Sequence, residues 1–306
     1  MKETATDRET IDTLHRFRNQ TKAARHLGIS VSSMKKRMRR VRKKGLLSET
    51  EIRTSNVKRY VITAAQNNTP PHTQFLDSIH QYCDHFGAKL MVIPVNYENI
   101  TLTSKNGKED KWWAAGLVPY FVTERQTLND NLILMADISV NATNKHPLSG
   151  FETVTGKRSG IFGHGQIEMQ MIPTPLAKLP KMLHTTGSIT LPNYSETKAG
   201  RIAEDNHCIG ALVVETDGNR FWMRQIRADE DGSFYDLNLK FTSSKVEQAE
   251  PALGLVCGDI HWDFICPKVK AATFTASDSI KAVLKPQKLI LHDVLDFYSA
   301  SHPLRS

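Results

Sequence analysis

The chain has 306 residues, which is enough for two domains or three small ones. Hydrophobic residues make up 40% of it, as in an ordinary soluble protein. No apolar run reaches the roughly 18 residues that a membrane-spanning helix needs, and the polar N-terminus MKETATDRET lacks the pattern of a signal peptide. We therefore expect a cytoplasmic protein with no membrane contact.

The net charge of +8 is distributed unevenly along the chain. Residues 1–58 contain 16 lysine and arginine residues against 6 acidic ones, whereas residues 59–306 contain 24 against 26. An excess of positive charge favours a polyanionic partner. That argument applies to the first 58 residues alone.

Residues 21–45 predict two helices separated by a tight turn. Thr21 is a candidate N-cap for a short helix, Gly28 provides the turn residue, and Ser30 is a candidate N-cap for a second helix. One narrow apolar stripe recurs at helical spacing on the second helix: Met34, Met38 and Val41. A further helix over residues 8–18, with apolar side chains at Ile11, Leu14 and Phe17, completes a three-helix unit.

This layout is typical of a helix-turn-helix, whose second helix enters the major groove of double-stranded DNA. The side chains expected to contact phosphates are Lys35, Arg39, Arg42 and Lys43. Those expected to reach base edges are Ser32, Ser33, Lys36 and Arg40. The alternative is a solvated basic helix that binds nothing, but the caps, the turn glycine and the apolar stripe agree with a helix-turn-helix.

We divide the chain into a DNA-binding domain at residues 1–50, a central α/β domain at 58–250 and a C-terminal segment at 251–306. The polar residues 48–57 are predicted to form a linker. Lys58–Ala65 and Ala88–Pro94 are predicted strands, and the helical spacing between them ends at Gly87, which together indicates a βαβ unit. Further strands are expected at Val118–Thr123, Leu132–Asp137, Gln166–Ile172, Met182–Ile189, Cys208–Thr216 and Arg220–Arg227.

Several polar stretches of the central domain have two interpretations. The loop Gln66–Thr69, with His72 behind it, follows the first strand, where α/β proteins bind ligands, but it also suits a simple turn. Residues 194–207 place Lys198, Glu204, Asp205 and His207 either in a cleft or on a solvated helix. Gly160–Gly165 is glycine-rich without the spacing of a phosphate-binding loop.

The four cysteines show no Cys-x-x-Cys spacing. Each lies within or beside an apolar segment, which predicts reduced, buried thiols: Cys83, Cys208, Cys257 and Cys266.

Acidic residues and histidines follow two apolar strands near the C-terminus. Leu255–Cys257 leads into Gly-Asp-Ile-His, which contains Asp259 and His261, and Leu289–Leu291 leads into His-Asp-Val-Leu-Asp, which contains Asp293. The carboxyl ends of adjacent parallel strands converge, and carboxylates with imidazole suit hard divalent cations. The alternative is that the two aspartates only cap loops and that the histidine is a packed side chain.

These motifs, with Ser-His at 301–302, resemble the first motifs of the calcineurin-like metallophosphoesterases. The wider layout resembles phage and prophage proteins that join a helix-turn-helix, an α/β domain and a C-terminal phosphoesterase. The stretches KRYVITAAQNNT, HPLSGFET, TTGSITLPNYSETKAG and GDIHWDF carry this resemblance. It implies a location in the bacterial host cytoplasm and a link to the breakdown of host DNA.

By this resemblance Asp259 and His261 bind one metal ion, Mn²⁺ or Mg²⁺, and Asp293 bridges two. Asp296 supports the ligands, and His302 protonates the leaving oxygen. The chain departs from the family where Ser301 replaces a metal-binding asparagine and Pro303 replaces an acidic residue. Residues 251–306 are also too few for a whole phosphoesterase domain, so we expect an incomplete two-metal site and weak or absent activity.

The expected fold class is α/β, with a three-helix head, a mixed α/β body and the start of a metallophosphoesterase-like layer. The expected function is that of a DNA-binding protein of a metal-dependent DNA phosphodiesterase family. The main alternative is a transcriptional regulator with a helix-turn-helix head and an effector-sensing α/β body. A third alternative is a chain that only binds DNA or blocks a full-length partner. The chain can also be a homo-oligomer, which the sequence does not decide.

Overall fold

The computed structural model describes residues 6, 9–10, 13, 20–43, 57–101, 110–175 and 180–295. The chain divides into two compact units: Met1–Phe234 with Phe241–Lys245, and Tyr235–Lys240 with Val246–Ser306. None of the described helices is both long and apolar enough to span a membrane. Of the predicted first helix, the structure describes Glu9, Thr10 and Thr13, all in helical conformation. Its apolar residues Ile11, Leu14 and Phe17, and the predicted linker at 48–57, lie outside the described residues.

Helices α2 (Gln20–His26) and α3 (Val31–Lys43) confirm the predicted helix-turn-helix pair. Gly28 has a φ of +61°, a left-handed conformation that glycine adopts without steric cost. Ser30 caps α3, because its Oγ accepts a hydrogen bond from the Ser33 backbone N–H at 3.1 Å. Thr21 does not cap α2, which already includes Gln20. The predicted stripe is buried against α2 in one cluster: Ala23, Ala24, Met34, Met38 and Val41.

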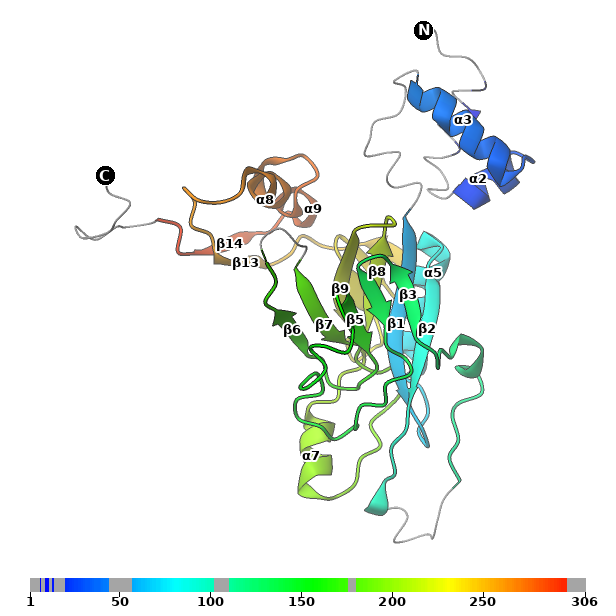
Figure 1. The fold of residues 1–306 in the computed structure, drawn as a ribbon, viewed down its shortest axis with the longest axis vertical. Helices are drawn as coiled ribbons and strands as arrows, with labels where there is room; N and C mark the ends of the chain where they lie inside the picture. The colour runs from blue at the N-terminus through cyan, green and yellow to red at the C-terminus, as the bar shows by residue number, and fades with distance from the viewer. Residues whose placement is uncertain are drawn as a thin grey trace, which may run out of the picture. The chain divides into compact units, whose positions relative to one another are not determined.

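A four-stranded sheet of order β2-β1-β8-β9 forms the first layer of the body (Figure 1). The predicted βαβ unit is confirmed, because β1 (Lys58–Gln66) and β2 (Lys89–Val95) are parallel and α5 (Thr73–Phe86) connects them. Gly87 ends the helix with a φ of +65°. The hairpin of β8 (Gly210–Thr216) and β9 (Phe221–Arg227) is antiparallel, as expected for two strands joined at Asp217–Asn219.

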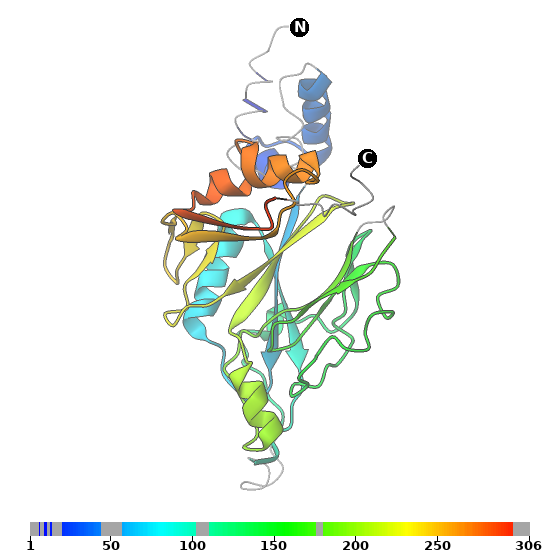
Figure 2. The ribbon, with the colours of Figure 1, turned by 90° about the vertical axis from the view of Figure 1, so that its left-hand side faces the viewer.

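A five-stranded sheet of order β3-β4-β5-β7-β6 forms the second layer. Its strands are β3 (Gln126–Asn129), β4 (Leu132–Leu134), β5 (Ser159–Phe162), β6 (Met169–Ile172) and β7 (Lys181–Thr185). The two sheets share one apolar core, in which Ile62, Met91 and Leu212 of the first sheet meet Leu132 and Ile161 of the second. Figure 2 shows α5, in cyan, along the four-stranded sheet.

Several strand predictions in this region are wrong or too long. The predicted strands Leu132–Asp137 and Met182–Ile189 end early, at Leu134 and Thr185. The predicted strand at Val118–Thr123 contains the 3₁₀ helix η1 (Val118–Tyr120), because Pro119 cannot donate a backbone hydrogen bond to a strand ladder. The predicted strand at Gln166–Ile172 begins only at Met169. The glycine-rich stretch Gly160–Gly165 overlaps strand β5, which was not predicted because glycine is infrequent in strands.

A three-stranded sheet, one strand pair and three short helical segments follow β9. A small sheet contains β10 (Phe234–Asp236), β11 (Leu239–Phe241) and β12 (Val246–Gln248). In the C-terminal unit, β13 (Gly254–Asp259) leads into α8 (Pro267–Lys270), the π-helical turn η2 (Ala271–Thr275), α9 (Ile280–Leu284) and β14 (Lys288–His292). Strands β13 and β14 are parallel neighbours, so their carboxyl ends lie at one edge.

Candidate metal centre and DNA-binding helix

The strand pairing of β13 and β14 continues beyond the ends of both strands. The backbone N–H of Ile260 donates to the carbonyl oxygen of His292 at 3.1 Å, and that of His261 donates to the carbonyl oxygen of Asp293 at 2.8 Å. Ile260 is buried, whereas the residues on either side of it are exposed. The backbone therefore holds the two predicted ligand-bearing turns against each other.

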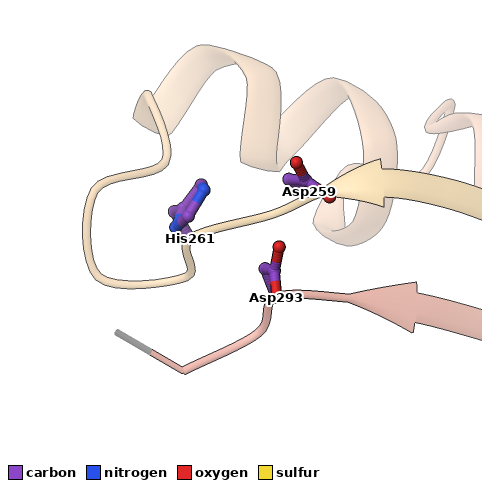
Figure 3. A group of neighbouring side chains, drawn as sticks. All are labelled: Asp259, His261 and Asp293. Carbon is purple, nitrogen blue, oxygen red and sulfur yellow. The ribbon is translucent and has the colours of Figure 1, made fainter. Parts of the chain in front are cut away.

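Three predicted ligands come together at this edge. One ligand atom each from Asp259, His261 and Asp293 lies within 4.8 Å of the other two. Figure 3 shows the side chains next to each other where the two strands end. All three are exposed, so water or a substrate can reach any ion that they hold.

Two of the three candidate ligands have strained backbones. The φ angle is +45° at His261 and +43° at Asp293, in the left-handed region that residues other than glycine adopt infrequently. Such conformations cost free energy and cluster at functional sites. Both residues belong to the group of three candidate ligands.

Two carboxylates and one imidazole suit a hard divalent cation such as Mn²⁺ or Mg²⁺. Three protein ligands leave several positions of an octahedral ion for water or phosphate oxygens. Asp296 and His302, which were predicted to assist, lie outside the described residues. The described ligands are therefore enough for one loosely held ion.

Helix α3 separates its buried and exposed faces sharply. The exposed polar and basic side chains are Ser32, Ser33, Lys35, Lys36, Arg39 and Arg40. Arg37 lies partly buried and forms an ion pair with Glu9 of the first helical segment at 3.7 Å, which directs it away from the exposed face. The side chains of Arg42 and Lys43 lie outside the described part of the structure.

The serines at the start of α3 bind one another. Ser30 Oγ lies 2.8 Å from Ser32 Oγ and donates to Ser33 Oγ at 2.9 Å. These hydroxyls support the cap, so a base contact by Ser32 or Ser33 has to compete with it.

The ambiguous residues of the central domain have structural roles. His72 caps α5, because its Nδ1 accepts from the Phe75 backbone N–H at 3.3 Å. His207 is directed inward, with Nε2 at 2.9 Å from the Thr190 carbonyl and Nδ1 at 3.0 Å from the Tyr194 hydroxyl. The other three polar residues, Lys198, Glu204 and Asp205, are exposed on α7 (Lys198–Asp205), as expected for a solvated helix.

Sequence reasoning did not single out Trp262 and Lys270. The Lys270 ammonium lies over the Trp262 ring, with Nζ 3.9 Å from the ring centroid. Their separation of eight residues spans a loop and the four-residue helix α8, so no helix or strand periodicity links them. Only the tertiary structure reveals the pair.

The N-terminal helices match a known protein family. Residues 11–40 match the family described as "Bacterial regulatory protein, Fis family". This match covers the described turn and most of α3, so the chain carries a helix-turn-helix DNA-binding motif.

The chain is also a homologue of "Protein A1" of Escherichia phage T5. The two are 36% identical over 258 residues, which is 81% of this chain and 46% of protein A1. The chain thus spans about half the length of that relative. No solved structure matches it significantly.

Proposed function

We propose that this A1-like protein binds double-stranded DNA through α3 and that its C-terminal unit belongs to a metal-dependent DNA phosphodiesterase. The observation that carries the proposal is the grouping of Asp259, His261 and Asp293 within 4.8 Å at the ends of two parallel strands. If His261 were only a packed side chain and the two aspartates only capped loops, the three side chains would have no reason to group at an exposed position. The helix-turn-helix supplies the affinity for DNA.

The ligands would have distinct roles. Asp259 and His261 would bind one ion, and Asp293 would be its third protein ligand. A bound Mn²⁺ or Mg²⁺ would polarise the phosphate and lower the pKa of a coordinated water. By family resemblance, Asp296 would support the ligands and His302 would protonate the leaving oxygen.

Calorimetry with Mn²⁺ tests the metal centre. We expect weak binding at a single site, which Asp259→Ala and Asp293→Ala each abolish because each removes one of three protein ligands. Asp278→Ala is the matched control, since Asp278 is an exposed aspartate of the same unit outside the cluster. An absence of Mn²⁺ binding by the parent chain would contradict the proposal.

Plasmid cleavage tests the chemistry separately. We expect very low or no cleavage by the 306-residue chain, because its three described ligands suffice for one ion and two-metal hydrolysis requires a pair. Brisk Mn²⁺-dependent cleavage that disappears in Asp259→Ala would instead show that another segment or subunit completes the site.

A transcriptional regulator is the second candidate, favoured by the match to a family of regulatory proteins. An effector would be expected at the carboxyl end of β1. The pocket there, lined by Gln66, Ser188, Tyr194 and His207 among others, has a volume of about 10 Å³. That volume holds about one water molecule. A small metabolite that changes DNA affinity would support the regulator.

A further inference from the structure

A lysine ammonium group lies over the aromatic ring of Trp262, the residue that follows the candidate ligand His261 in the chain. Lys270 Nζ lies 3.9 Å from the ring centroid of Trp262, which directly follows His261 in the chain. This distance allows a cation–π attraction. The Lys270 backbone N–H also donates to the Cys266 carbonyl at 2.9 Å, which fixes the start of the side chain.

Trp262 is itself anchored on two sides. Its backbone N–H donates to the carbonyl oxygen of Val294, the residue after Asp293, at 3.1 Å. Its ring packs against Phe274, with 5.7 Å between the ring centroids. The backbone that positions His261 and Asp293 therefore also positions the indole ring, and the ring positions the Lys270 ammonium.

The charges at this edge favour an anionic ligand. The carboxylates of Asp259 and Asp293 would neutralise one divalent cation. The negative charge of a bound phosphodiester would then need a further positive group nearby. Lys270 forms no ion pair with any residue in the described part of the chain, and its contact is an aromatic ring face. An ammonium has three donors, and a ring face does not satisfy them all.

We propose that Lys270, positioned by Trp262, binds a phosphate oxygen of the nucleic-acid strand at the candidate metal centre. The inference rests on the proposed function and adds a substrate-binding residue to it. Trp262 is a positioning residue in this arrangement. Lysine is suited to the task because its ammonium acts as a compact point charge toward phosphate.

The probe for this inference is the dinucleotide TpT, which has one phosphodiester and is too short to span the groove that α3 would read. Its binding to the full chain is measured by saturation-transfer NMR, once with Mg²⁺ and once with EDTA. We expect Lys270→Ala to weaken binding about threefold or more in both conditions, because one charge-assisted hydrogen bond is lost. Lys270→Arg retains the charge and stays within about twofold of the parent.

Two variants separate binding from packing. Lys268→Ala removes an exposed lysine two residues away and leaves TpT binding unchanged. Trp262→Leu keeps the Lys270 charge but removes its support, so binding weakens in the same direction as in Lys270→Ala. Circular dichroism of each variant checks that the fold is retained.

The outcomes distinguish this inference from the proposed function. If Mg²⁺ binds but Lys270→Ala matches the parent, or if Lys268→Ala weakens binding equally, the role of Lys270 is overturned and the metal centre stands. If no metal binds, the proposed function fails, and the comparison of Lys270→Ala with Lys268→Ala in EDTA still decides the role of Lys270. A parent chain that does not bind TpT in either condition overturns the inference.

Discussion

The four cysteines lie in contrasting environments, although their sequence contexts look alike. Burial, together with the nearby Asp84 carboxylate, raises the pKa of the Cys83 thiol to about 12. Burial also raises the pKa of Cys208. The prediction of four buried thiols is confirmed for Cys208 alone, because Cys83 and Cys257 are partly buried and Cys266 is exposed. The backbone N–H groups of Val269 and Lys268 lower the pKa of Cys266. Cys266 is the N-cap residue of α8, and its apolar neighbours Ile265 and Pro267 do not bury it.

Thiol alkylation tests this contrast. At pH 7.5 we expect iodoacetamide to modify Cys266 first, because the thiolate is the reactive form and only an accessible thiolate reacts quickly. Cys83 should react only after unfolding. Peptide mass spectrometry over time measures both, and Cys266→Ser should remove the fast phase. Equal rates at Cys83 and Cys266 in the folded protein would contradict the assignment.

At the scale of elements, helix α3 combines a buried apolar face with an exposed face that we propose binds DNA. Met34 and Val41 are fully buried and Met38 is 7% exposed, so these side chains hold the helix against α2. The opposite face presents exposed basic side chains, including Lys36 and Arg40. Substitutions on that face can therefore change DNA affinity without opening a cavity in the core.

Replacing Lys36 and Arg40 together with alanine should weaken DNA binding by at least about tenfold, or roughly 1.4 kcal/mol. The slope of log affinity against log salt should also become shallower, because fewer counterions are released. Fluorescence anisotropy at two salt concentrations measures both effects. Lys198→Ala with Arg201→Ala is the matched control, since both side chains are exposed on α7. If the affinity and the salt slope are both unchanged, Lys36 and Arg40 of α3 do not contact DNA.

At the scale of the whole molecule, buried histidines link folding to pH. Burial is the main cause that lowers the pKa of three imidazoles: His164, His184 and His207. In the unfolded chain these groups have a pKa near 6.5. Below that pH the unfolded state binds protons that the native state does not, so the stability present above about 6.5 is lost as the pH falls.

Urea unfolding at pH 7.5, 6.5 and 5.5 should therefore give a decreasing free energy of unfolding. Each histidine contributes at most about 1.4 kcal/mol per pH unit below 6.5. His146→Gln should leave this trend unchanged, because the His146 side chain is 68% exposed. A free energy of unfolding that is constant or rises toward pH 5.5 would show that other groups dominate the linkage.

Features that depend on neighbours in the chain were predictable from the sequence. The turn at Gly28, the cap at Ser30 and the end of α5 at Gly87 each follow from the conformational preference of one residue. Apolar periodicity gave the buried stripe of α3 and the parallel pair β1 and β2. The juxtaposition of Asp259, His261 and Asp293 also follows from local information, because two apolar strands end in ligand motifs and parallel strands align their ends.

Only the tertiary structure decided the order β3-β4-β5-β7-β6, the inward orientation of His207 and the pairing of Trp262 with Lys270. The strands of that sheet have three to five residues, too few for an alternating pattern to be distinctive. His207 and the Trp262–Lys270 pair depend on side chains brought together by loop closure, and residue spacing does not encode those contacts. Sequence patterns report the local preferences of the backbone, whereas sheet order and side-chain partners are set by which long-range contacts bury the most apolar surface.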